Sequence, residues 1–135
     1  MAEGRNFDLE IIAPDRVFYQ GQASMIEFNT TEGEIGVLPG HIPMTVIIKP
    51  GIVTIYETGK DEKKAAVHAG FAEILQDKVT ILAEIAEWPE EIDTERAEAA
   101  YERAQERLQQ KDPGTDMVRA EAALLRAMAR INLVK

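Results

Sequence analysis

The sequence predicts an antiparallel β-sandwich or barrel followed by a helical hairpin, and three observations support this prediction. Up to residue 87, short segments rich in β-branched and aromatic residues alternate with turn signals, a pattern typical of antiparallel β-domains. From residue 93 onward, alanine, glutamate and arginine dominate, and these are strong helix formers. The charge changes at the same place, with 7 basic and 17 acidic residues up to residue 93, and 8 and 7 after it.

The expected strands are short and separated by turns. Residues 7–11 alternate apolar and acidic side chains, as a half-buried strand does. A turn at residues 13–16 leads to a short strand at 17–19, which we expect Gly21 to break. Turns at residues 58–61 and 76–78 separate later strands. Those further strands are expected at residues 23–30, 44–48, 52–56, 65–68 continuing into 70–75, and 79–82.

Residues 31–41 carry Gly33, Gly36, Pro39 and Gly40 between two expected strands. Glycine permits backbone angles that a Cβ forbids, and proline fixes φ and removes a donor. The apolar residues among them need burial, so the stretch predicts a tight corner at which the chain crosses between sheets. It does not fit a phosphate-binding loop, because neither Lys-Ser nor Lys-Thr follows and no helix pattern begins there.

Two helices are expected after Asp93, which is a suitable N-cap for the first, at residues 94 to about 110. Thr115 or Asp116 can cap the second helix. Proline and glycine in residues 111–114 oppose continuation of the helix, and so short a connection makes the two helices antiparallel. The apolar faces comprise Ala97, Ala100, Ala104 and Leu108 on the first helix, and Ala120, Ala123 or Leu124, Ala127 and Ile131 on the second.

The seam of this hairpin consists mostly of alanine, which allows close approach but buries little area, and burial stabilises by only about 25 cal/mol per Å². A hairpin of this kind is marginal alone and needs a surface on which to dock. Two interpretations stay open. The hairpin is either a conformational switch between two positions of similar free energy or a permanently docked appendage.

Arginines form stripes along both expected helices, where like charges repel unless anions or carboxylates lie nearby. In one interpretation, glutamates of the hairpin neutralise them on a solvated face, where ion pairs contribute little. In the other, the guanidinium groups bind a polyphosphate through paired donors. The stripes comprise Arg119, Arg126 and Arg130 on the second helix and Arg96, Arg103 and Arg107 on the first.

Composition argues against several functional classes. The absence of cysteine excludes disulfides and thiolate metal sites, and His41 and His68 lie far apart, so we expect no metal site. The acidic first part argues against nucleic acid as a partner. No apolar run has the length of a membrane span or a signal peptide. Without a nucleophile beside a base or a phosphate-binding loop, we expect no catalytic residue, and the residues indicate a binding or regulatory module.

In the order of its elements and in the residues of its motifs, the whole chain resembles the ε subunit of bacterial F-type ATP synthases. The residues 32–43, EGEIGVLPGHIP, are the most specific part of the likeness. The other matching segments are residues 11–15, 68–71, 78–83, 92–97, 119–121 and 125–130.

This resemblance implies a ten-stranded sandwich at residues 1–87 and a mobile hairpin at residues 88–135. It also implies a non-catalytic rotor subunit, peripheral at the cytoplasmic face of the bacterial membrane, that links the γ subunit to the c-ring and so couples proton flow to ATP synthesis. The implied rotor and c-ring interface comprises Glu32, Gly33, Ile35, Gly36, Leu38, Pro39 and His41. When the hairpin is extended, it inhibits ATP hydrolysis at the α and β subunits. Arg119, Arg126 and Arg130 are then expected to meet an acidic segment of the β subunit.

The resemblance further implies that the folded hairpin binds ATP as a regulatory ligand, with the need for magnesium left open. The connection at residues 111–114 and the Trp88-Pro89 pair at the hinge are less usual for this family. Pro89 restricts rotation of the backbone at the hinge. The implied ATP-binding residues are Glu87, Ile92, Asp93, Arg96, Ala97, Arg103, Arg126 and Arg130.

Two other functions are compatible with the sequence. One is a purely structural rotor subunit whose hairpin never binds nucleotide. The other is a free-standing β-sandwich adaptor or carbohydrate-binding module with a helical tail, which would purify without stalk or catalytic subunits.

Overall fold

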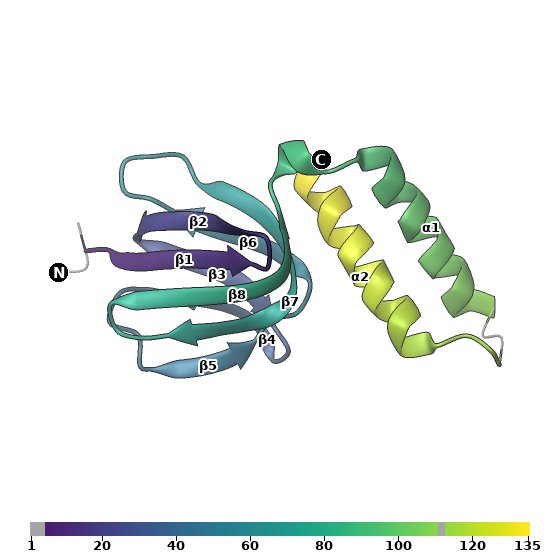
Figure 1. Cartoon of the computed structure of the whole chain (residues 1–135), viewed down its shortest axis with the longest axis horizontal. Helices are drawn as coiled ribbons and strands as arrows, with labels where there is room; N and C mark the ends of the chain where they lie inside the picture. The colour runs from purple at the N-terminus through teal and green to yellow at the C-terminus, as the bar shows by residue number, and fades with distance from the viewer. Residues whose placement is uncertain (1–4, 111–112) are drawn as a thin grey trace.

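The computed structural model describes residues 5–110 and 113–135. It has a β-sandwich followed by two helices, and the hairpin stands at one end of the sandwich (Figure 1). The sandwich elements are β1 (Phe7–Ala13), β2 (Arg16–Ala23), β3 (Met25–Thr30), β4 (Gly33–Val37), β5 (Met44–Ile47), β6 (Gly51–Tyr56), β7 (Lys63–Ile74) and β8 (Lys78–Glu87). The short helix η1 (Pro89–Glu91) then leads to α1 (Thr94–Gln110) and α2 (Met117–Val134).

The eight strands form one hydrogen-bonded path in the order β2-β1-β8-β7-β6-β3-β4, with β5 paired to β7. All neighbours are antiparallel except β1 and β8, which are parallel. The resemblance implied about ten strands, whereas the described residues form eight, so the class is confirmed with a smaller count. Strand β7 lies in the middle of the sheet, because it pairs with β5, β6 and β8. Its pairing with β8 fixes the strand that leads into the hinge.

The interior of the sandwich is filled by large apolar side chains from alternate positions of the strands. In β1, for example, Phe7, Leu9 and Ile11 are buried while Asp8 is exposed, as the alternating sequence predicts. The largest fully buried apolar side chains are Phe7, Phe28, Leu9, Ile11, Ile26, Ile55, Ile74 and Ile81. Complete burial of each such side chain contributes about 1.5–3 kcal/mol, so the sandwich has a core of its own.

Two local predictions were wrong. The corner predicted at residues 31–41 begins instead as strand β4, which pairs with β3 as a hairpin, and the irregular part starts only at Leu38. Gly21 does not break β2, because it pairs with Leu9 within the ladder. Its role is steric: a Cβ there would lie 3.0 Å from the hydroxyl of Tyr19. The remaining strands occur near the expected positions, with shifted ends.

The hairpin agrees closely with the prediction. The Asp93 carboxylate accepts from the Arg96 amide at 3.1 Å, and Asp116, rather than Thr115, caps α2 by accepting from the Arg119 amide at 3.1 Å. Within the predicted connection, residues 111–112 lie outside the described part. The buried residues of the two helices are Ala97, Ala104, Ala120, Ala127 and Ala129.

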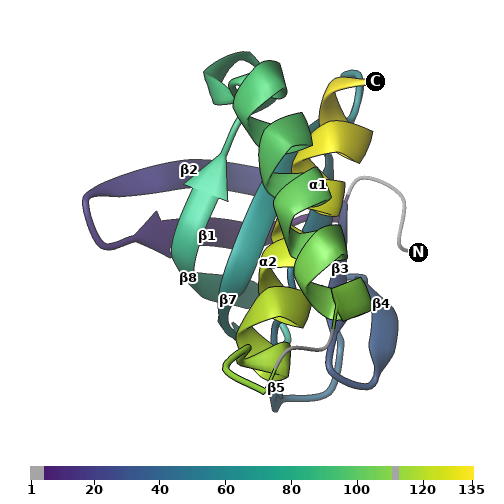
Figure 2. The same ribbon diagram turned by 90° about the vertical axis from the view of Figure 1, so that its right-hand side faces the viewer.

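α2 lies between the sandwich and α1, and it contacts β6 and β7 (Figure 1). Seen from its outer side, the hairpin presents α1 in front of α2 (Figure 2). The end of α2 returns to η1, so the hinge and the last turns of the chain are neighbours. Among the described helices, none has both the length and the apolar character that a membrane crossing needs.

Candidate functional site

A cavity of about 320 Å³ lies where the end of β8, the linker and both helices meet, and we call it the inner cavity. Its volume falls in the range of small-ligand sites. Because its walls come from the sandwich as well as the hairpin, it exists only while the hairpin is docked. It is lined by Glu87, Glu91, Ile92, Asp93, Arg96, Ala97, Ala100, Arg103 and Arg130.

Local sequence explains how these residues come together. Asp93 ends the linker and caps α1, which fixes the start of the helix. Arg96 and Arg103 are two turns apart on α1 and therefore lie on one side of it. Ala97 is 3% exposed, and its small side chain lets α2 approach, which brings Arg130 to the opposite wall.

The carboxylate of Glu87 joins the sandwich to α2. Its Oε1 accepts from Arg130 Nε at 2.7 Å, and the same oxygen lies 3.3 Å from Nε2 of His68. His68 is 1% exposed, and burial and the neighbouring Arg130 lower its pKa to about 4, so the imidazole is neutral at pH 7. Within the described part of the chain, Arg130–Glu87 is the ion pair that joins α2 to a strand.

The inner cavity has guanidinium groups available for an anion. Glu91 is occupied by Arg16 at 2.8 Å, and this hydrogen bond lowers the pKa of the Glu91 carboxyl. Glu87 is occupied by Arg130. Arg96 and Arg103 take part in no ion pair among residues 5–110 and 113–135. Two uncompensated guanidinium groups beside a third are a donor set that suits a chain of phosphates.

The structure gathers every predicted ATP-binding residue into the inner cavity except Arg126. Arg126 instead lines a second cavity of about 470 Å³ near the tip of the hairpin, together with Arg107 and Arg119. It is one turn from Arg130, so the two side chains lie about 6 Å apart along the helix axis. The arginines that sequence analysis treated as one stripe are thus divided between two cavities.

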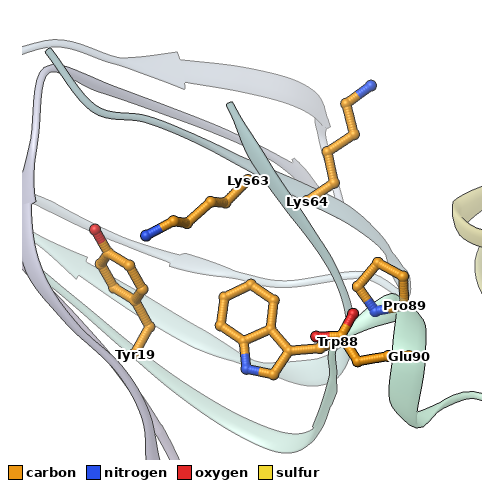
Figure 3. Close-up of a pocket in the computed structure, with 6 residues that line it drawn as sticks. All are labelled: Tyr19, Lys63, Lys64, Trp88, Pro89 and Glu90. Atoms are coloured by element: carbon orange, nitrogen blue, oxygen red, sulfur yellow. The ribbon is translucent and has the colours of Figure 1, made fainter. Parts of the chain in front are cut away.

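A third cavity, of about 370 Å³, lies beside the hinge, on the sandwich (Figure 3). Tyr19 and Trp88 provide aromatic walls, and the ammonium group of Lys63 points toward Tyr19, whereas that of Lys64 points away (Figure 3). Both lysines already have carboxylate partners, since Lys63 lies 2.9 Å from Glu57 and Lys64 lies 3.7 Å from Glu62. This neutralised site suits a polyphosphate less well than the inner cavity does.

The hinge itself is fastened to the sandwich. The ring of Trp88 stacks on Phe18, with 4.3 Å between centroids and 17° between planes. Arg16 donates to the carbonyl of Ala86 at 3.3 Å and to Glu91 at 2.8 Å. Glu91 also accepts from the Trp88 amide at 2.8 Å. These side-chain contacts of residues 88–91 join the hinge to the sandwich, while the end of α2 packs against η1 as well.

One apolar surface was missed by sequence analysis. Direct pairing between β2, β1, β8, β7 and β5 aligns five apolar residues into a row across the sheet. Most of their side chains are well exposed; Ile47 is 62% exposed and Phe71 is 45% exposed. Register could not be read from the sequence, so neither could the row. It comprises Val17, Ile12, Leu82, Phe71 and Ile47, in that order.

The predicted rotor interface lies elsewhere on the sandwich. Glu32, Gly33, Ile35 and Gly36 belong to the β3–β4 hairpin, and Leu38, Pro39 and His41 belong to the loop that follows it. The amide of Gly40 donates to the carbonyl of Gln76 at 2.7 Å, which ties this loop to the β7–β8 turn. From that turn β8 runs to the hinge, so the loop and the hairpin lie at opposite ends of β8 (Figure 1). Leu38 and Ile42 are 53% and 72% exposed.

Comparison with known proteins gives matches over nearly the whole chain. Residues 6–89 match the family model of the beta-sandwich domain of the ATP synthase delta/epsilon chain. Residues 90–135 match the model of its long alpha-helix domain. The ATP synthase epsilon chain of Caldanaerobacter subterraneus subsp. tengcongensis is 46% identical over 96% of this chain and 94% of its own. That of Ruminiclostridium cellulolyticum is 46% identical over 93% of both chains.

Solved structures give the same result. A chain of the Euglena gracilis mitochondrial ATP synthase, from a structure of OSCP, F1 and the c-ring, matches with a TM-score of 0.81 and 28% identity. The match covers 92% of this chain and 78% of that one. A chain of the central stalk and c-ring of the Tetrahymena thermophila enzyme matches with a TM-score of 0.57 at 13% identity, which shows the shared fold.

Proposed function

The chain belongs to the ATP synthase delta/epsilon family, and on this premise we propose that it senses ATP, which binds in the inner cavity and holds the hairpin against the sandwich. The chain is a non-catalytic subunit of the central stalk, with the γ subunit, the c-ring and the α and β subunits as partners. It couples proton flow to ATP synthesis by linking γ to the c-ring. We place it at the cytoplasmic face of the bacterial membrane, which it meets through the complex.

The observation that carries the ATP proposal is the composite wall of the inner cavity. Glu87 comes from β8, Arg103 from α1 and Arg130 from α2. Movement of the hairpin away from the sandwich separates Glu87 from Arg130 and opens the cavity. A ligand that needs all these walls binds the docked state better than the extended one, and this differential affinity is the condition for shifting the equilibrium.

In the docked state, the phosphates of ATP face Arg96, Arg103 and Arg130, which donate through their guanidinium groups. ATP at a concentration 100 times its Kd stabilises the docked state by about 2.7 kcal/mol. That is comparable to what an alanine seam with one joining ion pair contributes, so the ligand can decide the position of the hairpin.

At low ATP concentration the hairpin is released, and we propose that it then inhibits hydrolysis by reaching the catalytic subunits. Docking withholds two of the arginines that would meet the acidic β segment: Arg130 is bound to Glu87, and Arg126 is half-buried near His68. Arg119 is exposed in the docked state. Release of the hairpin makes all three available together.

The test is a calorimetric titration of the full chain with ATP, with and without magnesium. The wild type is expected to bind saturably, and Arg103→Ala is expected to weaken binding about tenfold or more, since a hydrogen bond to a charged group contributes about 1.5–3 kcal/mol. Arg107→Ala is the matched control, because this exposed arginine is on the same helix but lines the tip cavity. Absence of binding up to millimolar ATP would leave a structural rotor subunit.

We also propose two docking surfaces for the rotor. The apolar row from Val17 to Ile47 fits the γ subunit, because an apolar cross-strand face of this length is suited to a permanent partner. The loop carrying Leu38 fits the c-ring, because it lies at the end of the sandwich away from the helical hairpin. The two surfaces let one rigid domain join both partners.

Copurification with the γ subunit tests the first of these surfaces. Phe71→Asp, in the middle of the row, is expected to abolish copurification, because it would bury a charge in an apolar interface. Val118→Asp introduces the same charge at an apolar residue of α2 that is 78% exposed, and it should copurify as the wild type does. Equal retention of γ by both variants would contradict the assignment of the row.

A further inference from the structure

We propose that His68 is a positioning residue of the inner cavity, which holds the Glu87 carboxylate in the orientation that receives Arg130 and which makes nucleotide binding sensitive to pH. This inference rests on the proposed binding of ATP. It adds a buried residue that does not line the cavity and therefore acts through Glu87.

The first step is the shared carboxylate oxygen. Oε1 of Glu87 lies 3.3 Å from Nε2 of His68 and 2.7 Å from Nε of Arg130. Glu87 is 23% exposed, so water competes for its oxygens, whereas His68 is 1% exposed and is shielded from water. A rigid donor behind a partly exposed carboxylate restricts the rotamers of that carboxylate. His68 therefore fixes the position at which Glu87 binds the guanidinium group of Arg130.

The second step is the backbone that points His68 toward α2. In β7, Ala65 and Val67 belong to the core of the sandwich, while Ala66 and His68, equally buried, do not. These alternate residues face the other side of the sheet, where α2 lies against β7. The imidazole is thus buried by the docked hairpin and by the sheet together.

An irregular backbone segment follows His68. The register of β7 on β8 is the same on both sides of it, since His68 pairs with Ile85 and Gly70 with Ala83, but Ala69 between them has a positive φ of 58°. Gly70 has φ of 127°, and a Cβ there would collide with the backbone oxygen of Leu82. The irregularity lies directly after His68, so the position of the imidazole relative to β8 is set by the backbone.

The third step is the tautomer. Nδ1 of His68 is buried and has no hydrogen-bond partner within the described residues. A proton on Nδ1 would leave a buried donor without a partner. It would also leave Nε2 as an acceptor facing the Glu87 carboxylate, so that two acceptors would repel each other. The neutral ring therefore carries its proton on Nε2, which donates to Glu87.

Protonation of both nitrogens is unfavourable in the docked state. The charged groups that face His68 are Glu87 from β8 and Arg126 and Arg130 from α2. Burial and the two guanidinium groups outweigh the carboxylate and lower the pKa of His68 to about 4. When the hairpin leaves, the imidazole becomes exposed and its pKa returns toward the usual value of about 6.5.

The sign of the pH effect follows from these two values. Below about pH 6.5 the released state binds more protons than the docked state, so acid favours release. The effect grows as the pH falls from about 6.5 toward about 4 and is absent above pH 7.5. At pH 5.5 docking, and the ATP affinity that depends on it, is weakened by up to about tenfold through His68 alone.

The test measures ATP affinity at pH 7.5 and pH 5.5 for the wild type, His68→Gln and His68→Leu. The glutamine amide can still donate to Glu87 but does not titrate, so His68→Gln should bind within about threefold of the wild type at pH 7.5. Its remaining pH dependence reports the phosphates of ATP, and the wild type should show a further decline of up to about tenfold. His68→Leu should lose about tenfold already at pH 7.5, because Glu87 loses its donor.

Two outcomes would overturn the inference while ATP sensing stands: His68→Leu binding as the wild type does, or His68→Gln and the wild type sharing one pH profile. If the wild type fails to bind ATP at all, the proposed function fails and the inference with it. A readout without nucleotide separates these cases. Nitrogen-15 spectra of the two histidines, assigned with His41→Gln, should show His68 of the docked population as the Nε2–H tautomer without titration above pH 5. An Nδ1–H tautomer in the docked population, or titration of that population near pH 6.5, would overturn the positioning role.

Discussion

The sandwich buries phenylalanine, leucine and isoleucine side chains completely, whereas the buried residues of α1 and α2 are all alanine. Complete burial of a large apolar side chain contributes about 1.5–3 kcal/mol, and a methyl group contributes about 0.8 kcal/mol. Helix α2 touches β6 and β7, while α1 packs mainly on α2. The sandwich is therefore stable by itself, and the hairpin, which we propose to move, is held by contacts that one ligand can outweigh.

The largest effect is expected in the core of the sandwich. Phe28 is completely buried, and Phe28→Ala leaves a cavity that costs about 3–5 kcal/mol of unfolding free energy. Chemical denaturation followed by far-ultraviolet circular dichroism measures this loss. A loss below about 1 kcal/mol would mean that the sandwich core is not the stable region that we describe.

Overpacking the seam of the hairpin should destabilise the hairpin without destabilising the sandwich. Ala127 is 1% exposed, and Ala127→Leu forces the helix away at a cost of about 1–3 kcal/mol. Hydrogen exchange should show lost protection in α2 with unchanged protection in β7 and β8. Loss of protection in both regions at once would show that hairpin and sandwich form one cooperative unit.

The hinge should respond more weakly than the seam. Trp88→Ala removes the stack on Phe18, which contributes about 0.5–1.5 kcal/mol beyond its buried area, and it should increase the released fraction of hairpins. Trp88→Phe keeps an aromatic ring and is the control. Hydrogen exchange of α2 reports the released fraction, and identical exchange in both variants would mean that the stack does not restrain the hairpin.

A surface ion pair should matter least. Lys78 lies 3.1 Å from Glu10 across β8 and β1, and its side chain is 45% exposed. Lys78→Met is expected to change the unfolding free energy by less than about 1 kcal/mol, because solvent screens the pair. Thermal unfolding at low and high salt measures this change, and a loss as large as that of Phe28→Ala would reverse the ranking.

Local signals carried the prediction of the hairpin. The N-caps Asp93 and Asp116 and the alanine faces depend on residues within a few positions of each other, and the structure confirms the caps and most of the buried alanines. Ala129 is buried as well, although it was not predicted to be on the apolar face. The corner at residues 31–41 was wrong in its first half, because glycine content does not reveal that Gly33 to Val37 pairs with β3. Pairing is a long-range property, and composition alone does not determine it.

The candidate site divides in the same way. The resemblance to a family supplied the predicted ATP-binding residues, and the inner cavity contains all of them except Arg126. Arg126 lies one turn nearer the tip of the hairpin and lines the cavity there. Sequence analysis treated His68 as an isolated histidine, because its partners Glu87 and Arg130 are 19 and 62 positions away. The apolar row was missed for a similar reason, since it needs the register of five strands.

The central claim, that ATP holds a weakly docked hairpin against a rigid sandwich, is tested most directly by a distance measurement. The chain has no cysteine, so Glu73→Cys on β7 and Val118→Cys at the start of α2 give one unambiguous pair of spin labels. Without nucleotide, two distance populations are expected, and ATP should collapse them to the shorter, docked one. At an ATP concentration that just saturates the wild type, the change should be much smaller in Arg103→Ala. A single population that ATP leaves unchanged would contradict the account and make the hairpin a fixed part of the rotor.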